Sequence, residues 1–464
     1  VNISTGRKRA SVPSICGVLP PNERQPQRAQ MRCNSFEQFW MRWNRCRKYN
    51  RLHAHSSSGL NLPKPAWDKE VRHPMAQSQN GIIIRNTTIK VRLYPTPAQA
   101  TLFDKTFDCC RYLWNRMLTD QARFYAETDV HFIPTPAKYK KSAPFLKEVD
   151  CGALISVHQN LRRAFQRFFD HPDRFRHPAY KKKKHCKNSY TIYCQYYRSG
   201  NGASIYLTDN DIRLPKAGIV KARLYRKPLH WWKLKTATVS KSPSGKYFCS
   251  LTFEYAVKPP KAVQPTVETT LGLNYSLSHF YIDSNGRAAD APHWIQHSQD
   301  KLGRMQKRLA QMQRGSKNYE QQLHRLQCLY EHIANQRKDF IHKESRRIAN
   351  VWDAVCVKDT DLVEMSQTLQ LGNVMDAGYG QFRTYLQYKL ERMGKSYIVV
   401  EKYFPSAKTC HFCGAVNDAL AADARRWRCP SCGAVLMRAN NAAENLRNQG
   451  LAQYYANQGR RIPA

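Results

Sequence analysis

Two CxxC pairs near the C-terminal end constrain this chain more than any other feature. The four residues are Cys410, Cys413, Cys429 and Cys432, and fifteen residues separate the second from the third. Gly414 and Gly433 follow the pairs directly, which allows the tight turn that points two thiolates at one ion. Four thiolates at this spacing are typical of a tetrahedral structural zinc site, and four unrelated cysteines would rarely show it. The sequence therefore predicts a zinc ribbon over residues 405–435.

The charge of the chain indicates a polyanionic partner. Lys and Arg total 75 against 34 Asp and Glu in 464 residues, a formal charge of +41. Such a charge repels itself unless a polyanion neutralises it, which favours nucleic acid. A membrane surface is the competing polyanion, but no run of about eighteen apolar residues and no clear basic amphipathic helix supports it. Several aromatic residues that suit base stacking lie among the basic ones: Tyr180, Tyr190, Tyr193, Tyr196, Tyr197, Trp231 and Trp232.

Eleven of the fifteen cysteines lie outside the two pairs and follow no pattern, and no signal peptide is recognisable. We therefore expect a reduced, cytoplasmic protein. Residues 1–78 are rich in Pro, Ser, Arg and Asn, and within them only Ser35–Leu52 has a helical pattern. They are expected to form a basic, disordered extension. The alternative, with equal support, is that these residues are translated upstream sequence and that the functional start is Met31 or Met75.

The rest of the chain predicts an α+β multidomain fold. Alternating β-branched residues in 79–97 and 188–258 predict a small β-barrel, which helices in 98–187 interrupt, notably Ala98–Tyr125 and Ser156–Phe169. KSPSGK (Lys241 to Lys246) predicts a hairpin loop between two strands, and a Pro-rich linker covers 259–267. Strands, one long helical segment from His297 to Val351 and further strands then predict an α/β domain over 268–404 and 436–450, with the ribbon inserted and a tail at 451–464.

Basic residues on the predicted helices and loops are the candidate phosphate contacts. They are Arg162, Arg163, Lys181, Lys182, Lys183, Lys184, Arg346 and Arg347. A lysine run is often only a solvated loop, but in a chain of this charge, flanked by tyrosines, phosphate contact is the better interpretation. The amides of Gln159 and Asn160 are candidates for reading adenine edges in DNA.

Seven segments, in order, resemble the TnpB family of transposon-encoded RNA-guided nucleases, which is related to type V CRISPR effectors. They are RLYPTPAQ (Arg92 to Gln99), CCRYLWN (Cys109 to Asn115), RLPKAGIVKARL (Arg213 to Leu224), KDFIHKESRRIA (Lys338 to Ala349), DAGYGQFRTYLQYK (Asp376 to Lys389), YFPSAKTCHFCG (Tyr403 to Gly414) and NAAENL (Asn441 to Leu446). The resemblance implies that the barrel is a wedge domain, that residues 98–187 are a helical recognition lobe, and that the α/β domain is an RNase H-like RuvC domain.

A RuvC site needs carboxylates, because two divalent metals about 4 Å apart clamp the reacting phosphodiester. The resemblance implies an Asp, a Glu and an Asp at three positions, where this chain has Asn274, Lys358 and Ala439. Asn is neutral, the lysine ammonium repels a cation, and Ala offers no ligand. The candidate substitute carboxylates are Asp283, Asp359 and Glu444. Strand alternation should aim Asp359 at the opposite face, so Glu444 is the best substitute. We expect no catalytic residues and no catalytic Mg²⁺.

The chain is therefore similar to the TnpB-like nuclease-dead repressors, TldR. The resemblance implies a monomer on one guide RNA that binds double-stranded DNA beside a short adjacent motif, in the bacterial cytoplasm at the nucleoid. Bound without cutting, it would repress transcription by occupancy. Two alternatives stay open: an active RNA-guided DNA endonuclease with substitute ligands, and a zinc-ribbon protein that binds DNA or RNA directly without a guide.

Overall fold

The computed structural model of the chain describes residues 81–183, 186–196, 202–276, 279–289, 294–360, 378–421 and 423–459. The predicted extension 1–78, Lys184, Tyr197 and the end of the predicted tail lie outside these ranges. The described chain forms two compact units. The first consists of residues 111–146 and 158–182, and the second takes up the remainder.

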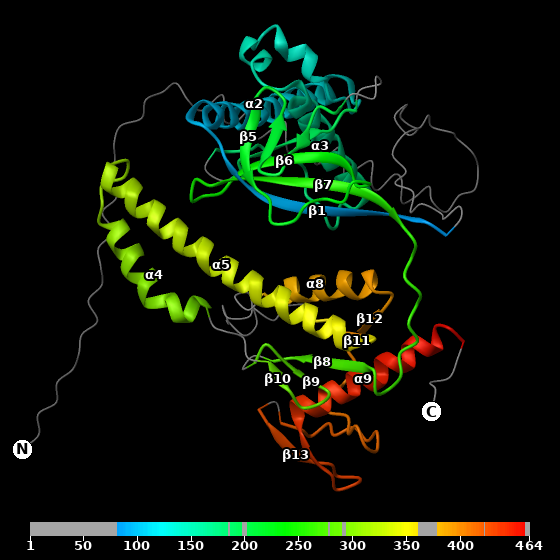
Figure 1. Cartoon of the computed structure of the whole chain (residues 1–464). Helices are drawn as coiled ribbons and strands as arrows, with labels where there is room; N and C mark the ends of the chain where they lie inside the picture. Colours follow the sequence, from blue (N-terminus) through cyan, green and yellow to red (C-terminus); the bar gives the residue numbers. More distant parts are fainter. Residues whose placement is uncertain are drawn as a thin grey trace, which may run out of the picture. The chain divides into compact units, whose positions relative to one another are not determined.

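A seven-stranded sheet forms the N-terminal part of the second unit. Its strands follow the order β2-β6-β7-β1-β5-β4-β3, and every pair is antiparallel. Their bounds are Ile83–Tyr94 (β1), Ser189–Tyr193 (β2), Tyr206–Leu207 (β3), Asp211–Leu214 (β4), Gly218–Arg223 (β5), Lys233–Lys241 (β6) and Tyr247–Val257 (β7). Figure 1 shows β1 running alongside β7. Alternation along β1 buries Ile89, Val91 and Leu93, as the sequence predicts.

This sheet is an open, curled half-barrel, because β2 and β3 stand at the two ends of its hydrogen-bonded order. The hairpin expected at KSPSGK is present between β6 and β7. Its turn is closed by the N–H of Lys246, which bonds the hydroxyl of Ser242, and Gly245 takes the left-handed φ of +76°. The sequence therefore predicts the strands and this turn correctly, while the barrel that it predicts is only partly formed.

Helices α2 (Pro97–Thr128) and α3 (Cys151–Asp170), with the 3-10 turns η1 (Pro136–Lys140) and η2 (Pro144–Lys147), make up the helical insertion. In the first unit the packing is aromatic. The ring of Phe165 on α3 contacts those of His131 and His177, with ring centroids 4.5 and 5.2 Å apart. Leu113 and Leu161 are fully buried there, so these helices enclose a small core of their own.

A five-stranded mixed sheet organises the C-terminal part of the second unit. Its order is β10-β9-β8-β11-β12, with β8 antiparallel to β9 and parallel to β11. The bounds are Thr270–Tyr275 (β8), Tyr281–Asp283 (β9), Ala288–Ala289 (β10), Ala354–Lys358 (β11) and Ser396–Val400 (β12). Because parallel strands need long crossovers, two helices lie between β10 and β11, and a further helix precedes β12.

The prediction of one long helical segment from His297 to Val351 is wrong, because the helix is interrupted near the middle. The structure has two helices, α4 (Trp294–Ala310) and α5 (Lys317–Val351). Gly315 adopts φ +83°, and Ser316 caps α5 by accepting the N–H of Tyr319 at 3.1 Å. The break lets α4 fold back on α5, where Leu302, Leu326 and Ile333 form a small cluster.

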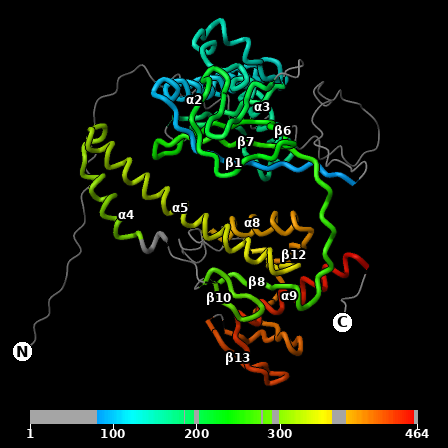
Figure 2. The backbone as a smooth tube through the Cα atoms, in the orientation of Figure 1, coloured from blue at the N-terminus to red at the C-terminus, as the bar shows by residue number. Residues whose placement is uncertain are grey.

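Helices cover both faces of the five-stranded sheet (Figure 2). Helices α5 and α8 (Tyr379–Arg392) pack on Leu271 and Leu273 of β8 and on Val355 and Val357 of β11. Helix α9 (Arg438–Ala456) lies on the opposite face, where Gly272 and Cys356 point by strand alternation. The face turned toward α9 is therefore also the face of Asn274 and Lys358.

Gly272 is required for this close approach of α9. A Cβ placed on it would lie 1.9 Å from the carbonyl oxygen of Ala443, which is helix backbone and cannot move independently. We expect Gly272→Ala to lower the free energy of unfolding by about 3 kcal/mol, through overpacking. Denaturant unfolding measures this effect. Gly303→Ala in α4 is the matched control: its Cβ would meet nothing within 4 Å, so it should stabilise by about 0.5 kcal/mol. Equal effects of the two changes would contradict the packing argument.

Candidate nucleic-acid interface and metal positions

The structure brings the three predicted degenerate positions together. Strands β8 and β11 pair in parallel with Val357 opposite Leu273, so the next positions in the same register are Lys358 and Asn274. Ala439 is the second residue of α9, and its carbonyl oxygen accepts the side-chain amide of Asn274 at 3.3 Å. Three residues that are far apart in sequence thus meet at one point, between the C-terminal ends of two parallel strands and the N-terminus of a helix.

Lys358 sits at this point as a partly desolvated cation. Its Nζ donates to the carbonyl oxygen of Phe404 at 2.9 Å. Burial lowers the pKa of Lys358, with no carboxylate among the described residues close enough to oppose that shift. A divalent ion at this point would face an ammonium group instead of a carboxylate.

Two of the three substitute carboxylates are directed away from this point. Asp283 is buried and caps its own turn, accepting the N–H groups of Asn285 and Arg287 at 3.0 and 2.9 Å. Asp359 faces Arg383 of α8 at 3.8 Å, on the other side of the sheet, as strand alternation predicts.

Glu444, the substitute that the sequence favours, is neutralised by Arg447 at 2.5 Å. Within the described ranges, the four cysteines are the one cluster of three or more His, Cys, Asp or Glu side chains that could hold a metal. Asp361, Glu364 and Asp376 fall in 361–377, outside the description.

The four cysteines converge as their spacing predicts. Their sulfur atoms all lie within 4.8 Å of one another, with Cys410 and Cys432 at 3.7 Å and Cys413 and Cys429 at 3.6 Å. A tetrahedron with Zn–S bonds of about 2.3 Å places sulfurs about 3.8 Å apart, so the donor set fits zinc. The two turns are equivalent: the N–H of Gly414 bonds the carbonyl of Cys410 at 2.9 Å, and the N–H of Gly433 bonds that of Cys429 at 3.0 Å.

The local backbone favours the thiolate form at one of the four cysteines. A backbone hydrogen bond from Cys432 lowers the pKa of the Cys429 thiol to about 6, and the thiolate is the form that a metal binds. The pKa of the Cys432 thiol is raised instead, by desolvation and by hydrogen bonds with the neighbouring thiols. Both turn glycines have left-handed φ values, +76° at Gly414 and +72° at Gly433. Strands β13 (Arg426–Arg428) and β14 (Val435–Met437) form a short hairpin around the second pair.

Two asparagines that the sequence reasoning missed attach the cysteine module to α9. Asn441 and Asn445 lie one helical turn apart, and their amides donate to the carbonyl of Thr409 at 2.7 and 2.6 Å. Asn441 also accepts the backbone N–H of His411 at 3.0 Å. The only signal in the sequence was the i, i+4 spacing of two amides on one helix face. These contacts fix the loop before Cys410 directly against the helix that carries Ala439.

In the first unit, the predicted contacts Arg162 and Arg163 lie side by side on the exposed face of α3, next to the exposed Asn160. The opposite face of this helix is buried through Leu161 and Phe165. The side-chain oxygen of Gln159 is buried without a partner among the described residues. Gln159 and Asn160 therefore differ in environment, and only Asn160 is presented fully to solvent.

The segment leading into the lysine run is pinned to α2. Asn115 bonds the backbone of Lys181 twice, accepting its N–H at 2.8 Å and donating to its carbonyl at 3.0 Å. The Lys181 ammonium lies 3.8 Å from the ring centre of Trp114, a cation–π contact. Lys181, Lys182 and Lys183 are all exposed, and Lys183 pairs with Asp108 at 3.4 Å. The basic run is thus a positioned segment rather than an unattached loop.

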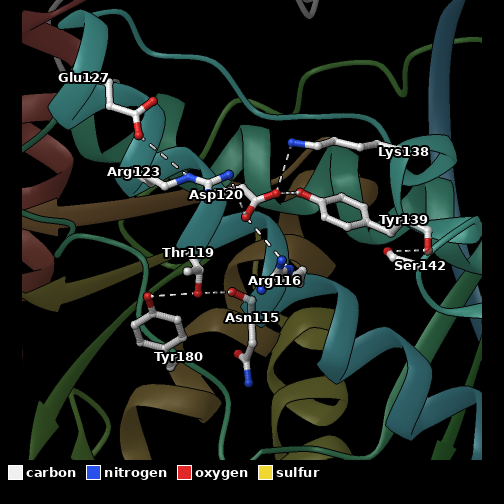
Figure 3. Close-up of polar contacts among 10 residues, drawn as sticks. All are labelled: Asn115, Arg116, Thr119, Asp120, Arg123, Glu127, Lys138, Tyr139, Ser142 and Tyr180. Carbon is white, nitrogen blue, oxygen red and sulfur yellow. Dashed lines mark hydrogen bonds and ion pairs between the residues drawn. The ribbon is translucent and has the colours of Figure 1, made fainter. Parts of the chain in front are cut away.

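Asp120 is the buried centre of a polar network in this unit (Figure 3). Its carboxylate accepts from Nζ of Lys138 at 3.1 Å and from the hydroxyl of Tyr139 at 3.0 Å, with Arg116 at 3.8 Å. Burial alone would raise the pKa of Asp120, but these hydrogen bonds outweigh it and lower the pKa. The same view shows Tyr180 reaching the hydroxyl of Thr119, at 3.3 Å. The network fixes η1 against α2.

We expect Asp120→Asn to cost about 2 kcal/mol of unfolding free energy at neutral pH, because a buried charged acceptor is lost. The pKa of Asp120 is lower in the folded protein than in the unfolded chain. The stability that its carboxylate contributes is therefore fully present above the unfolded pKa, about 3.9, and is lost as the pH falls through the folded pKa. Urea unfolding at several pH values measures it. Asp170→Asn, an exposed carboxylate paired only with Gln166, should change little at any pH. A difference in unfolding free energy between Asp120→Asn and wild type that persists at acidic pH would contradict the role given to the Asp120 carboxylate.

The two predicted phosphate contacts on α5, Arg346 and Arg347, lie in different environments. Arg347 bonds Glu344 at 2.7 Å and the hydroxyl of Tyr281 at 2.8 Å, so its guanidinium is held inside the domain. Arg346 is exposed beside it. The aromatic candidates divide in the same way: Tyr190 is buried in the core, whereas Tyr180, Tyr196 and Trp231 are exposed.

Three family models match the chain. The model described as "Cas12f1-like, TNB domain" matches residues 379–446, a "Helix-turn-helix domain" of the OrfB_IS605 type matches 85–129, and the "Probable transposase" OrfB_IS605 matches 252–369. None of the helices in the described part of the chain is long and apolar enough to span a membrane.

Relatives match over most of their length. A protein of Streptomyces pristinaespiralis is 28% identical over 78% of this chain and 89% of its own. InsQ of Escherichia coli K12 is 25% identical over 79% of this chain and 93% of its own. Both carry the name "Putative RNA-guided DNA endonuclease".

Among solved structures, a Cas12f1–sgRNA–target DNA complex matches with a TM-score of 0.51 at 11% identity, covering 79% of this chain and 99% of that one. The half-barrel and the cysteine-bearing domain thus define a Cas12f-like fold. Within that class, the chain is similar in sequence to the IS605 OrfB models and to these two relatives.

Proposed function

We propose that this chain is an RNA-guided DNA-binding protein that does not cut DNA and represses transcription by occupying its target. One observation carries the proposal. Asn274, Lys358 and Ala439 meet at a single point, and among the described residues no cluster of three or more His, Cys, Asp or Glu side chains lies there to hold a divalent ion. Relatives named RNA-guided DNA endonucleases support the RNA and DNA partners.

The proposal assigns the half-barrel as the wedge, the helical insertion as the recognition lobe and the five-stranded sheet as a RuvC-like domain with an inserted zinc ribbon. The strand order β10-β9-β8-β11-β12, three antiparallel strands continued by two parallel ones, supports an RNase H-like sheet. The proposed phosphate contacts are Arg162, Arg163, Lys181, Lys182, Lys183, Lys184 and Arg346, and Asn160 with Gln159 is proposed to read the adjacent motif. Arg347 acts in this proposal through its neighbours, because Glu344 and Tyr281 hold it.

The names of the relatives favour a second function, an active RNA-guided DNA endonuclease. In that case a divalent ion would have to bind beside Lys358, whose partly buried ammonium opposes it. The chemistry of the donor set therefore favours binding without cutting.

The test uses the full chain purified with the RNA that it carries from its host. Sequencing that RNA gives the guide, and a matched duplex with magnesium tests binding and cutting together. The relative from Streptomyces pristinaespiralis, assayed with its own guide, is the positive control. We expect guide-dependent binding without cutting. Guide-dependent cutting would establish the endonuclease instead, and specific DNA binding by a protein that carries no discrete RNA would establish a direct DNA-binding protein.

A further inference from the structure

We propose that the point where Asn274, Lys358 and Ala439 meet has become a phosphate-binding site, in which the Lys358 ammonium holds a backbone phosphate of a DNA strand. The inference rests on the proposed function, because it assumes that DNA enters the face of the sheet turned toward α9. It goes further in giving the replaced residues a role. A site that would hold metal ions through carboxylates instead carries a positive charge that is available to a phosphodiester.

The hydrogen bonds of Lys358 leave capacity for a ligand. An ammonium group has three N–H donors, and among the described residues the carbonyl of Phe404 is the one acceptor within reach, at 2.9 Å. That carbonyl orients the group without neutralising it. A cation that is half-buried and without a carboxylate partner costs free energy, which an incoming phosphate would offset.

The carboxylates nearby do not compete for Lys358. Asp359 is directed to Arg383, Glu444 to Arg447, and Asp283 to the N–H groups of its own turn. Each of these three carboxylates thus has another partner. The local charge at the meeting point is that of Lys358 itself, which favours an anion over a cation.

The neighbours suit an extended strand rather than a small compact anion. The Asn274 amide already donates to the Ala439 carbonyl, and Ala439 has no side chain beyond Cβ to fill the space that a carboxylate would take. A single lysine is a point charge without the fork geometry that encloses a free phosphate. Affinity then comes from one phosphate contact within a longer strand, and it should be independent of base sequence.

The experiment measures binding of a fluorescein-labelled single-stranded oligothymidylate to the full chain over a series of KCl concentrations. One phosphate contact to a single strand contributes about 0.7 to the slope of log K against log salt. We expect Lys358→Met to reduce the magnitude of this slope by about that amount and to weaken binding about five-fold at the lowest salt. Lys358→Arg, which keeps the charge, should retain most of both.

Lys395→Met is the matched control. Lys395 belongs to the same domain and also bonds backbone carbonyls, but Asp353 neutralises it at 3.3 Å, so its loss should leave the slope unchanged. A Lys358→Met protein with wild-type slope and affinity and an unchanged circular-dichroism melting curve would overturn the proposal. An equal loss in the Lys395 control would also overturn it, because the effect would then not be specific to this site.

Different results would show that the proposed function is wrong. They are guide-dependent cutting, or DNA binding without any RNA, in the wild-type protein. The oligothymidylate measurement needs neither a guide nor a target, so the Lys358 contact is tested whichever of those results is found.

Discussion

Guide-dependent DNA cleavage should appear when Asn274→Asp, Lys358→Glu and Ala439→Asp are combined, and in none of the three single variants. The register of β8 and β11 places the first two positions on neighbouring strands, and the amide of Asn274 touches the backbone of Ala439. Three carboxylates at this point would supply the negative charge that two divalent ions need. An added Asp in the first turn of α9 also suits the positive end of that helix.

We expect the rate of guide-dependent, magnesium-dependent cutting to rise over wild type by on the order of a thousand-fold or more. The gain is large because cutting requires that both metal ions bind the phosphodiester. A labelled target duplex resolved on a denaturing gel measures it. The control is Asn274→Asp, Lys358→Gln, Ala439→Asp, which removes the ammonium and restores two of the three charges. We expect that control to bind and not to cut.

A triple carboxylate variant that is folded, binds the target and leaves it intact would show that these three positions do not form a metal site. Full activity of Ala439→Asp alone would show that Asn274 and Lys358 are no obstacle to a divalent ion. Either result would remove the main argument for binding without cutting.

Local patterns in the sequence predicted the elements that depend on local rules. The alternation in β1, the Ser242–Lys246 turn and the convergence of the CxxC pairs all follow from residue type and spacing. The break between α4 and α5 was missed because Leu309 and Met312 continue the apolar spacing toward Gly315. There a left-handed glycine and a serine cap outweigh periodicity.

The candidate site was harder to predict, because it depends on contacts between distant segments. The sequence identified Asn274, Lys358 and Ala439 only through resemblance, and the parallel register of β8 with β11 is what brings them together. The structure also shows what becomes of each charged neighbour. Arg347, expected at a phosphate, is held by Glu344 and Tyr281. The i,i+3 spacing indicates the pair with Glu344, but no local pattern indicates the contact with Tyr281.

The structure gives the four cysteines a structural role that does not depend on the proposed loss of ligands at Asn274, Lys358 and Ala439. Asn441 and Asn445 of α9 take their acceptors from the loop that leads to Cys410. The same helix presses its backbone on the sheet at Gly272. The ribbon thus helps to seat α9 on the sheet, a structural requirement that does not depend on catalysis.

If the four cysteines bind zinc, loss of that ion should therefore loosen α9 as well as the segment that carries the cysteines. Zinc held by four thiolates contributes on the order of 10 kcal/mol of binding free energy, which becomes folding free energy when the ligands converge only in the folded chain. We expect Cys429→Ser to reduce the zinc content from about one ion per chain to near zero. Amide exchange should then accelerate over residues 405–445, including the first turns of α9.

Elemental analysis and hydrogen exchange by mass spectrometry measure the two effects, and Cys328→Ser in α5, outside the cluster, is the control. A Cys429→Ser protein that retains its zinc would contradict the ligand assignment. Zinc loss with unchanged exchange in α9 would contradict only the coupling through Asn441 and Asn445. Asn441→Ala separates the two, because it removes the amide and leaves all four thiols in place. That variant should keep its zinc while exchange in the first turns of α9 accelerates, since the helix then loses its attachment to the carbonyl of Thr409.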